Sequence, residues 1–241
     1  MSINLFLSTD DSARVARTVL NLARHDISRW ALTGGVAIEL HILRLGGKRI
    51  IRRLNDLDFV AASFDSIPET IGSELLLRHV HPHDPPGKTM LQGVDPETGV
   101  RIDVFRAYGG EMERTSPITI AMLALRTVSL QDLVARHARL NWGLVEGRPV
   151  APKYARDFLR LMDLVTTGEV ERIWQEHRKS QSPESFAETA LQLRRMIASR
   201  SELLIPPTYS TNIDEVCRRC QGRGAFPLCD PRQILSILGY C

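Results

Sequence analysis

The chain has 241 residues, of which 43% are hydrophobic and 24% are charged, and its formal net charge is +3. This length and composition indicate a globular protein that buries an ordinary hydrophobic core. The sequence contains no apolar run near the roughly 20 residues of a membrane span, and its N-terminus lacks the segments of a signal peptide. We therefore expect a cytoplasmic protein with no membrane partner.

The basic residues are unusual in kind, because 27 of the 31 are arginine. Arginine makes planar, bidentate contacts with phosphate, so this bias would suit a polyphosphate or RNA ligand. A genomic codon bias towards arginine explains the same composition without any ligand. Composition alone therefore identifies no partner.

An amphipathic helix is predicted near the N-terminus. Residues 8–11 offer several helix-capping side chains, and Val15, Val19 and Leu22 follow at helical spacing. We interpret this helix as scaffold.

A glycine turn between a strand and a helix is the first feature that indicates a binding site. A short strand over residues 30–33 ends at Thr33, Gly34 and Gly35 form the turn, and a helix follows over 36–45. Glycine lets the backbone approach a ligand closely, and the free N–H groups at a helix N-terminus suit phosphate. A glycine pair before a helix is also common in ordinary tight turns.

Three acidic residues are predicted to lie on strands near this turn. Asp56 and Asp58 alternate with apolar side chains, so they share one face of a strand. Asp103 alternates in the same way on a later strand, which follows a hairpin turn at residues 95–99. Carboxylates placed side by side repel one another unless a cation lies between them, and Mg²⁺ or Mn²⁺ prefers such oxygen ligands.

The segments around the acidic strands complete this half of the chain. Arginines at positions 49, 52 and 53 directly precede Asp56, and they could reach phosphate oxygens or pair with nearby carboxylates. A helix is predicted over residues 68–78, because Pro68 suits a first helical turn and three leucines follow it.

The pattern after about residue 112 predicts mainly helices. One helix should follow a cap at Ser129, a second should begin near Pro152, and two more are expected around residues 170–176 and 183–199. On the second helix, four charged residues project from one face: Lys153, Arg156, Asp157 and Arg160. An ordinary solvated face explains this spacing without a ligand.

The glycine turn, the D-x-D pair and the third strand-borne aspartate together resemble the nucleotidyltransferase superfamily. Residues 28–165 look most similar to AbiEii-type nucleotidyltransferases, toxins of bacterial toxin–antitoxin and abortive-infection systems. The resemblance implies an α/β (α+β) fold in which a mixed sheet is flanked by helices and followed by a helical C-terminal region. It also implies a metal-dependent enzyme that moves a nucleoside monophosphate from a nucleoside triphosphate to an acceptor hydroxyl.

The resemblance implies roles for individual residues as well. Asp56, Asp58 and Asp103 would be catalytic and would hold Mg²⁺ or Mn²⁺. The nucleotide-binding positions would be Thr33, Gly34, Gly35, Lys153 and Asp157. The acceptor stays open between RNA, a protein and a small molecule, and an antitoxin is the implied partner. The alternative is a non-catalytic nucleotide-binding or interaction protein that keeps the fold.

We expect three regions: a nucleotidyltransferase-like domain over residues 1–112, a helical domain over 113–205 that closes the cleft, and a cysteine-containing tail over 206–241. The tail holds all four cysteines, and thiols in a cytosolic protein favour zinc over disulfides. The wide spacing of the last two favours thiols packed against helices instead. The candidate ligands of a structural Zn²⁺ are Cys217, Cys220, Cys229 and Cys241.

Overall fold

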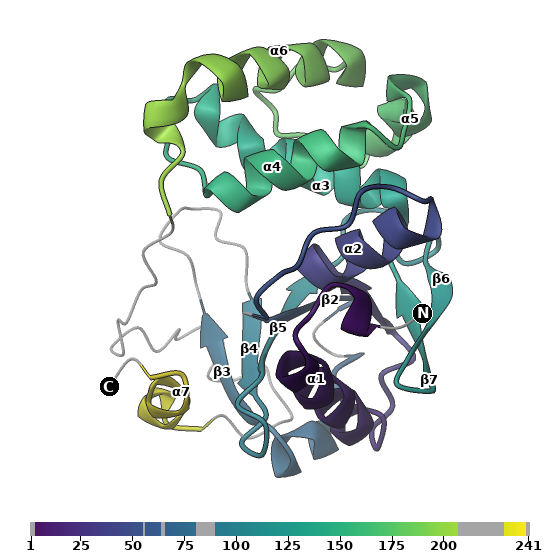
Figure 1. Ribbon diagram of the computed structural model, residues 1–241, viewed down its shortest axis with the longest axis vertical. Helices are drawn as coiled ribbons and strands as arrows, with labels where there is room; N and C mark the ends of the chain where they lie inside the picture. Colours follow the sequence, from purple (N-terminus) through teal and green to yellow (C-terminus); the bar gives the residue numbers. More distant parts are fainter. Residues whose placement is uncertain (1–2, 55, 64–65, 81–89, 207–228, 240–241) are drawn as a thin grey trace.

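The computed structural model describes residues 3–54, 56–63, 66–80, 90–206 and 229–239. Its centre is a mixed seven-stranded sheet with the strand order β3-β4-β5-β2-β1-β7-β6 (Figure 1). The strands are β1 (Trp30–Thr33), β2 (Leu57–Ala61), β3 (Leu76–Val80), β4 (Met90–Val94), β5 (Arg101–Arg106), β6 (Ser116–Ile120) and β7 (Leu123–Thr127). The α/β fold class expected from the sequence is thus confirmed.

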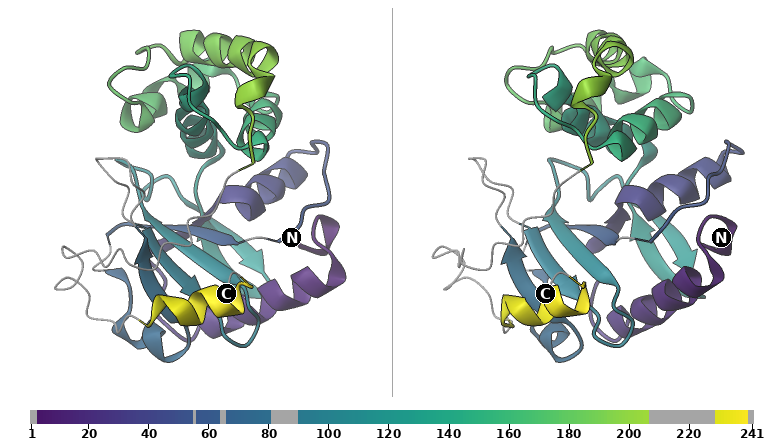
Figure 2. Two further views of the ribbon diagram at one scale, coloured as in Figure 1. Left: turned by 90° about the vertical axis from the view of Figure 1, so that its left-hand side faces the viewer. Right: turned by 60° about the vertical axis from the view of Figure 1, so that its left-hand side comes forward.

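Helices cover both sides of this sheet. Helices α3 to α6 gather at one end of the molecule, with α2 between them and the strands (Figure 1), whereas α1 and α7 lie on the opposite side (Figure 2). Their bounds are α1 (Thr9–Leu22), α2 (Gly34–Arg44), α3 (Leu130–Asn141), α4 (Pro152–Met162), α5 (Thr167–His177), α6 (Phe186–Ser199) and α7 (Pro231–Ile237). Short 3-10 helices are η1 (Ile3–Leu5), η3 (Glu69–Ser73), η4 (Trp142–Leu144) and η5 (Ser201–Leu203).

The three central strands set the relative positions of the glycine turn and the acidic residues. β2 pairs antiparallel with β1 and parallel with β5. In this register, Asp58 lies opposite both Thr33 and Asp103. Because β1 ends at Thr33 and α2 begins at Gly34, two residues earlier than predicted, the glycine turn is the first turn of α2 and lies directly beside Asp58.

Several predicted helices are confirmed together with their caps. Ser8 caps α1, accepting a hydrogen bond from the Asp11 amide at 3.1 Å, and Ser129 caps α3 through the Asp132 amide at 3.0 Å. The apolar stripe of α1, including Val15, is fully buried, as expected of a scaffold helix. Within the described ranges, no helix combines the length and apolar character needed to cross a membrane.

The helix predicted over residues 68–78 is wrong. Only the short η3 forms there, and β3 follows it and pairs antiparallel with β4. Leu75 and Leu77 are buried while Leu76 between them is half-buried. This alternation places two leucines in the core, and strand pairing overrides the helical propensity of the leucine run.

The expectation of mainly helical structure from residue 113 is wrong for residues 116–127. β6 and β7 form a hairpin there, and β7 extends the sheet by pairing in parallel with β1. Ala121 and Met122 form the hairpin turn with φ values of 49° and 69°. Such turns usually contain glycine or asparagine, so the sequence lacks the signal that identifies them. The helical part begins instead with α3 at Leu130.

The described end of the chain returns to the sheet through α7. The Cys229 amide donates to the Leu77 carbonyl of β3 at 2.9 Å, and Ile234 and Leu235 of α7 are buried. The other three candidate zinc ligands, Cys217, Cys220 and Cys241, lie outside the described residues. Zinc binding therefore stays a prediction.

A buried network joins the helical part to the loop before β6. Asp132 accepts hydrogen bonds from Arg114 at 2.7 Å and from His177 Nε2 at 3.0 Å. Burial acts to raise the pKa of Asp132, but hydrogen bonds from His177, Arg114 and Ser129 outweigh it and hold this pKa at about 2. Glu111 lies next to Asp132 and His177, but Arg136 already pairs with it at 2.6 Å. We therefore interpret the group of Glu111, Asp132 and His177 as structural.

Replacing Asp132 by Asn should lower the free energy of unfolding by about 2 kcal/mol near neutral pH, since its pKa falls from 3.8 to about 2 on folding. A carboxylate with a depressed pKa stabilises the fold above its unfolded pKa and loses that contribution as the pH falls through its folded pKa. Urea unfolding of wild type and variant should therefore give a difference that shrinks between about pH 4 and about pH 2. A difference independent of pH would contradict the assignment.

Candidate functional site

Three carboxylates meet where β2 and β5 run side by side. One oxygen from each of Asp56, Asp58 and Asp103 lies within 4.8 Å of the others, and we call these three residues the acid cluster. The parallel register places Asp58 next to Asp103, and Asp56 precedes β2 by one residue, on the same side as Asp58. The structure brings these residues together as the alternation predicts, while their catalytic role stays a prediction.

The glycine turn is in direct contact with this cluster. Gly34 has φ of +64°, and a Cβ atom added to it would lie 1.9 Å from Asp58 Oδ2. Glycine is required here for both its conformation and the close approach of the backbone to the carboxylate. Thr33 is buried, and its hydroxyl has no hydrogen-bond partner among the residues that the structure describes. Beside it, a Cβ atom on Gly35 would lie 3.3 Å from Arg52 Nη1.

The electrostatics of the cluster indicate negative charge that the protein compensates only in part. Burial and the neighbouring carboxylates of Asp56 and Asp103 raise the pKa of Asp58 well above its usual value. Burial likewise raises the pKa of Asp103 to about 6, with Arg101, Gln92 and Lys153 opposing the effect. A bound cation would remove this repulsion.

Arg101 forms ion pairs with two of the three acids. Its Nη2 forms an ion pair with Asp56 Oδ2, and its Nε lies 3.2 Å from Asp103 Oδ2. Sequence reasoning missed this residue, although a signal was present. Arg101 stands two positions before Asp103 on the same strand, and strand alternation places both on one face.

The two residues singled out on α4 behave differently. The Lys153 ammonium lowers the pKa values of both Asp58 and Asp103, so α4 brings it to the acid cluster. Asp157 is buried with its side chain 3% exposed, and it pairs with Arg52. Its predicted role in nucleotide binding stays a prediction.

Arg52 belongs to a network that joins α2 to α4. Its Nε donates to Glu39 Oε1 at 2.6 Å, and Arg160 Nη2 donates to Glu39 Oε2 at 2.9 Å. Glu39 is fully buried between the two arginines. The sequence left open whether Arg52 contacts phosphate or pairs with nearby carboxylates, and the structure shows that it pairs with carboxylates. Sequence reasoning missed Glu39, because a lone glutamate in an apolar helix carries no sign of its partners.

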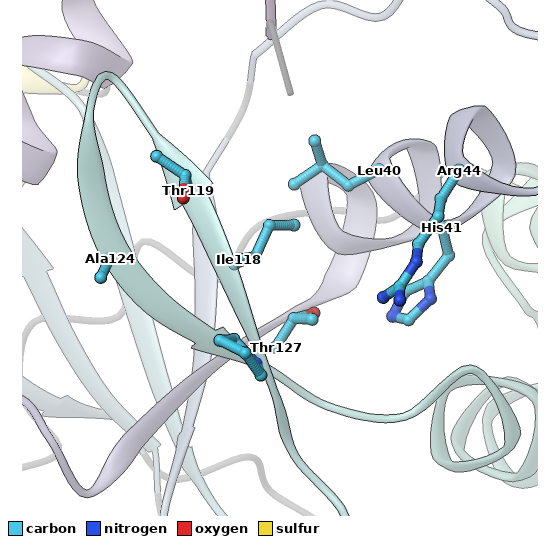
Figure 3. A pocket seen from close by; sticks show the side chains of 8 residues that line it. Leu40, His41, Arg44, Ile118, Thr119, Ala124 and Thr127 are labelled. Carbon is cyan, nitrogen blue, oxygen red and sulfur yellow. The ribbon is translucent and has the colours of Figure 1, made fainter.

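A cavity of about 390 Å³ lies elsewhere, between α2 and the β6–β7 hairpin. Figure 3 shows Leu40, His41 and Arg44 of α2 facing Ile118 and Thr127 of the hairpin. No predicted site residue lines it. The imidazole of His41 is committed to the Val128 carbonyl at 2.9 Å. We therefore place the candidate chemistry at the acid cluster.

The donor set of the acid cluster fits a hard divalent cation. It consists of carboxylate oxygens only, which Mg²⁺ and Mn²⁺ prefer, and it lacks the thiolate and imidazole ligands that favour zinc. The raised pKa values of Asp58 and Asp103 agree with a site that gains from added positive charge.

Comparisons with known proteins give low-identity matches to solved structures. No protein-family model and no curated protein matches the sequence. An antigenic nucleotidyltransferase-like protein from Paracoccidioides brasiliensis is 16% identical with a TM-score of 0.40, over 81% of this chain and 91% of the other. JHP933 from Helicobacter pylori is 13% identical with a TM-score of 0.28, over 81% and 91%. We therefore infer function from the residues of the site.

Proposed function

We propose that this protein is a metal-dependent nucleotidyltransferase that moves a nucleoside monophosphate from a nucleoside triphosphate to an acceptor hydroxyl. The observation that carries the proposal is the position of the Gly34 turn against the carboxylates of Asp56, Asp58 and Asp103. The carboxylates provide oxygen ligands for a divalent cation. The turn and the N-terminus of α2 provide backbone N–H groups for phosphate.

The surrounding residues support binding of a triphosphate. The half-buried Gly34 and Gly35 can donate backbone N–H groups to phosphate oxygens, and so can the Thr33 hydroxyl, which has no partner among the described residues. Lys153 of α4 adds positive charge near Asp58. In this proposal Asp157 positions Arg52, whose Nη1 lies beside Gly35.

The chemistry assigned to the site is an in-line displacement. The acceptor oxygen forms a bond to the α-phosphorus, the bond from that phosphorus to the bridging oxygen breaks, and pyrophosphate leaves with the electron pair. In this proposal Asp103 also helps to remove the proton of the attacking hydroxyl. Asp56, Asp58 and Asp103 would hold a divalent cation, which would supply positive charge to stabilise the triphosphate and the leaving group. The turn fixes the orientation of the phosphates.

The finer assignment follows the resemblance to AbiEii-type proteins. It extends the proposal to a toxin with an antitoxin partner, acting on RNA, a protein or a small molecule.

One observation favours a second candidate, a nucleotide-binding protein without catalysis. Arg101 already pairs with two of the three acids, so part of the charge that a metal would neutralise is compensated by the chain itself. This candidate predicts that a nucleotide binds without release of pyrophosphate.

Incubation of the protein with each α-labelled nucleoside triphosphate, Mg²⁺ and a cell extract tests the proposal. We expect label to move from one nucleotide into the protein, RNA or small-molecule fraction, and chelation of the metal to prevent it. Binding of a triphosphate without any transfer would favour the second candidate, and the absence of binding would contradict both.

A further inference from the structure

We propose that Arg101 is a built-in counter-cation of the acid cluster, and that its guanidinium must leave Asp56 and Asp103 before a divalent cation binds there. This inference rests on the proposed function, and it names the residue that controls metal binding at that site. In this role Arg101 stabilises the metal-free site and lowers the affinity for the metal.

The position of Arg101 is built into the fold. Its side chain is only 9% exposed, and it extends from the central strand β5 on the face that carries Asp103. An exposed arginine would reach such a site at an entropic cost and with strong screening by water. A buried guanidinium between two carboxylates instead compensates charge that the surrounding protein cannot solvate.

Arg101 contacts two of the three carboxylates that a metal would need. Its Nη2 pairs with Asp56 Oδ2, and its Nε lies 3.2 Å from Asp103 Oδ2. The other oxygen of Asp103 is also engaged, because Oδ1 accepts a hydrogen bond from Gln92 Nε2 at 3.1 Å. Within the part of the chain that the structure describes, no side chain donates a hydrogen bond to Asp58.

This difference among the acids predicts competition between the guanidinium and the metal. Asp58 offers its oxygens to a cation directly, whereas one oxygen of Asp56 and one of Asp103 already contact the positive charge of Arg101. A guanidinium and a divalent cation that share the same carboxylates repel each other at short range. Removal of the guanidinium should therefore raise the affinity for the metal.

The test measures Mn²⁺ binding to the full chain by titration, with free Mn²⁺ detected by electron paramagnetic resonance. We expect Arg101→Gln to bind Mn²⁺ at least about tenfold more tightly than wild type, a difference of about 1.4 kcal/mol. Arg101→Lys keeps the charge and should bind close to wild type. Arg106→Gln is the matched control, since Arg106 is exposed at the end of the same strand and projects from the opposite face. It should leave the affinity unchanged.

A second readout covers the stability of the variant. Without metal, Arg101→Gln should melt at a lower temperature than wild type, because the carboxylates lose their counter-cation, and Mn²⁺ should raise its melting temperature more than that of wild type. If the variant does not fold alone, folding upon addition of Mn²⁺ supports the inference, and failure to fold with Mn²⁺ overturns it.

The outcomes separate this inference from the proposed function. Equal or weaker Mn²⁺ binding by Arg101→Gln overturns the role of Arg101, while label transfer by the wild type would leave the nucleotidyltransferase assignment intact. If neither wild type nor Arg101→Gln binds Mn²⁺, the assignment of the three aspartates as a metal site is wrong, and both proposals fail.

Discussion

Replacing Asp58 by Asn should lower the rate of nucleotidyl transfer at least about a thousandfold, which corresponds to about 4 kcal/mol of transition-state stabilisation. Asp58 lies beside Asp103 in the register of the sheet, two residues after Asp56 and in contact with Gly34. Its loss would remove one metal ligand from the centre of the site, and metal ions supply several kcal/mol in such reactions. The initial rate of label transfer at saturating Mg²⁺ measures the effect.

The same variant should fold at least as well as the wild type when no metal is present. The pKa of Asp58 is raised in the folded protein, so its ionisation costs stability as the pH rises above the unfolded value. Asn removes that cost, and the melting temperature in a chelator should be equal or higher, most clearly at neutral pH. Asp163→Asn is the control for loss of a carboxylate away from the site, because Asp163 is exposed at the end of α4, and it should leave the rate of transfer unchanged. A folded Asp58→Asn protein with wild-type activity would exclude the site.

Replacing Gly34 by Ala should abolish transfer by displacing the Asp58 carboxylate. The added Cβ would stand 1.9 Å from Asp58 Oδ2, so the carboxylate or the turn must shift. A misplacement of about 1 Å commonly costs a hundredfold in rate. We therefore expect a loss of at least about a hundredfold in transfer and weaker Mn²⁺ binding.

Gly46→Ala is the matched control for this substitution. Gly46 also has a left-handed backbone, with φ of +71°, but an added Cβ there would meet no atom within 4 Å. It should lose stability of about 1 kcal/mol from backbone strain alone and keep its transfer rate. Equal effects of the two substitutions on transfer would show that strain, rather than contact with Asp58, is responsible.

The core of the site could be predicted because alternation and chain order specify it. Asp56, Asp58 and Asp103 each alternate with apolar residues, and parallel pairing of β2 with β5 is all that is needed to bring them together. Gly34 was recognisable as a turn residue, but its contact with Asp58 depends on the antiparallel pairing of β1 with β2.

The parts that could not be predicted depend on contacts between segments far apart in the chain. The pairing of Arg52 with Asp157 spans 105 positions, and no local pattern indicates it. The β6–β7 hairpin was missed because Ala121 and Met122 adopt positive φ values without the usual turn residues. Strand pairing and burial decided these regions, and local propensity did not.

The most direct test compares α-labelled and γ-labelled forms of the nucleotide that the protein accepts, in parallel reactions of the wild type and Asp58→Asn. Nucleotidyl transfer predicts that the wild type attaches the α label to the acceptor and releases the γ label in pyrophosphate. Asp58→Asn should neither label the acceptor nor release pyrophosphate. Transfer of the γ label to the acceptor, or release of pyrophosphate that persists in a folded Asp58→Asn protein, would contradict the account.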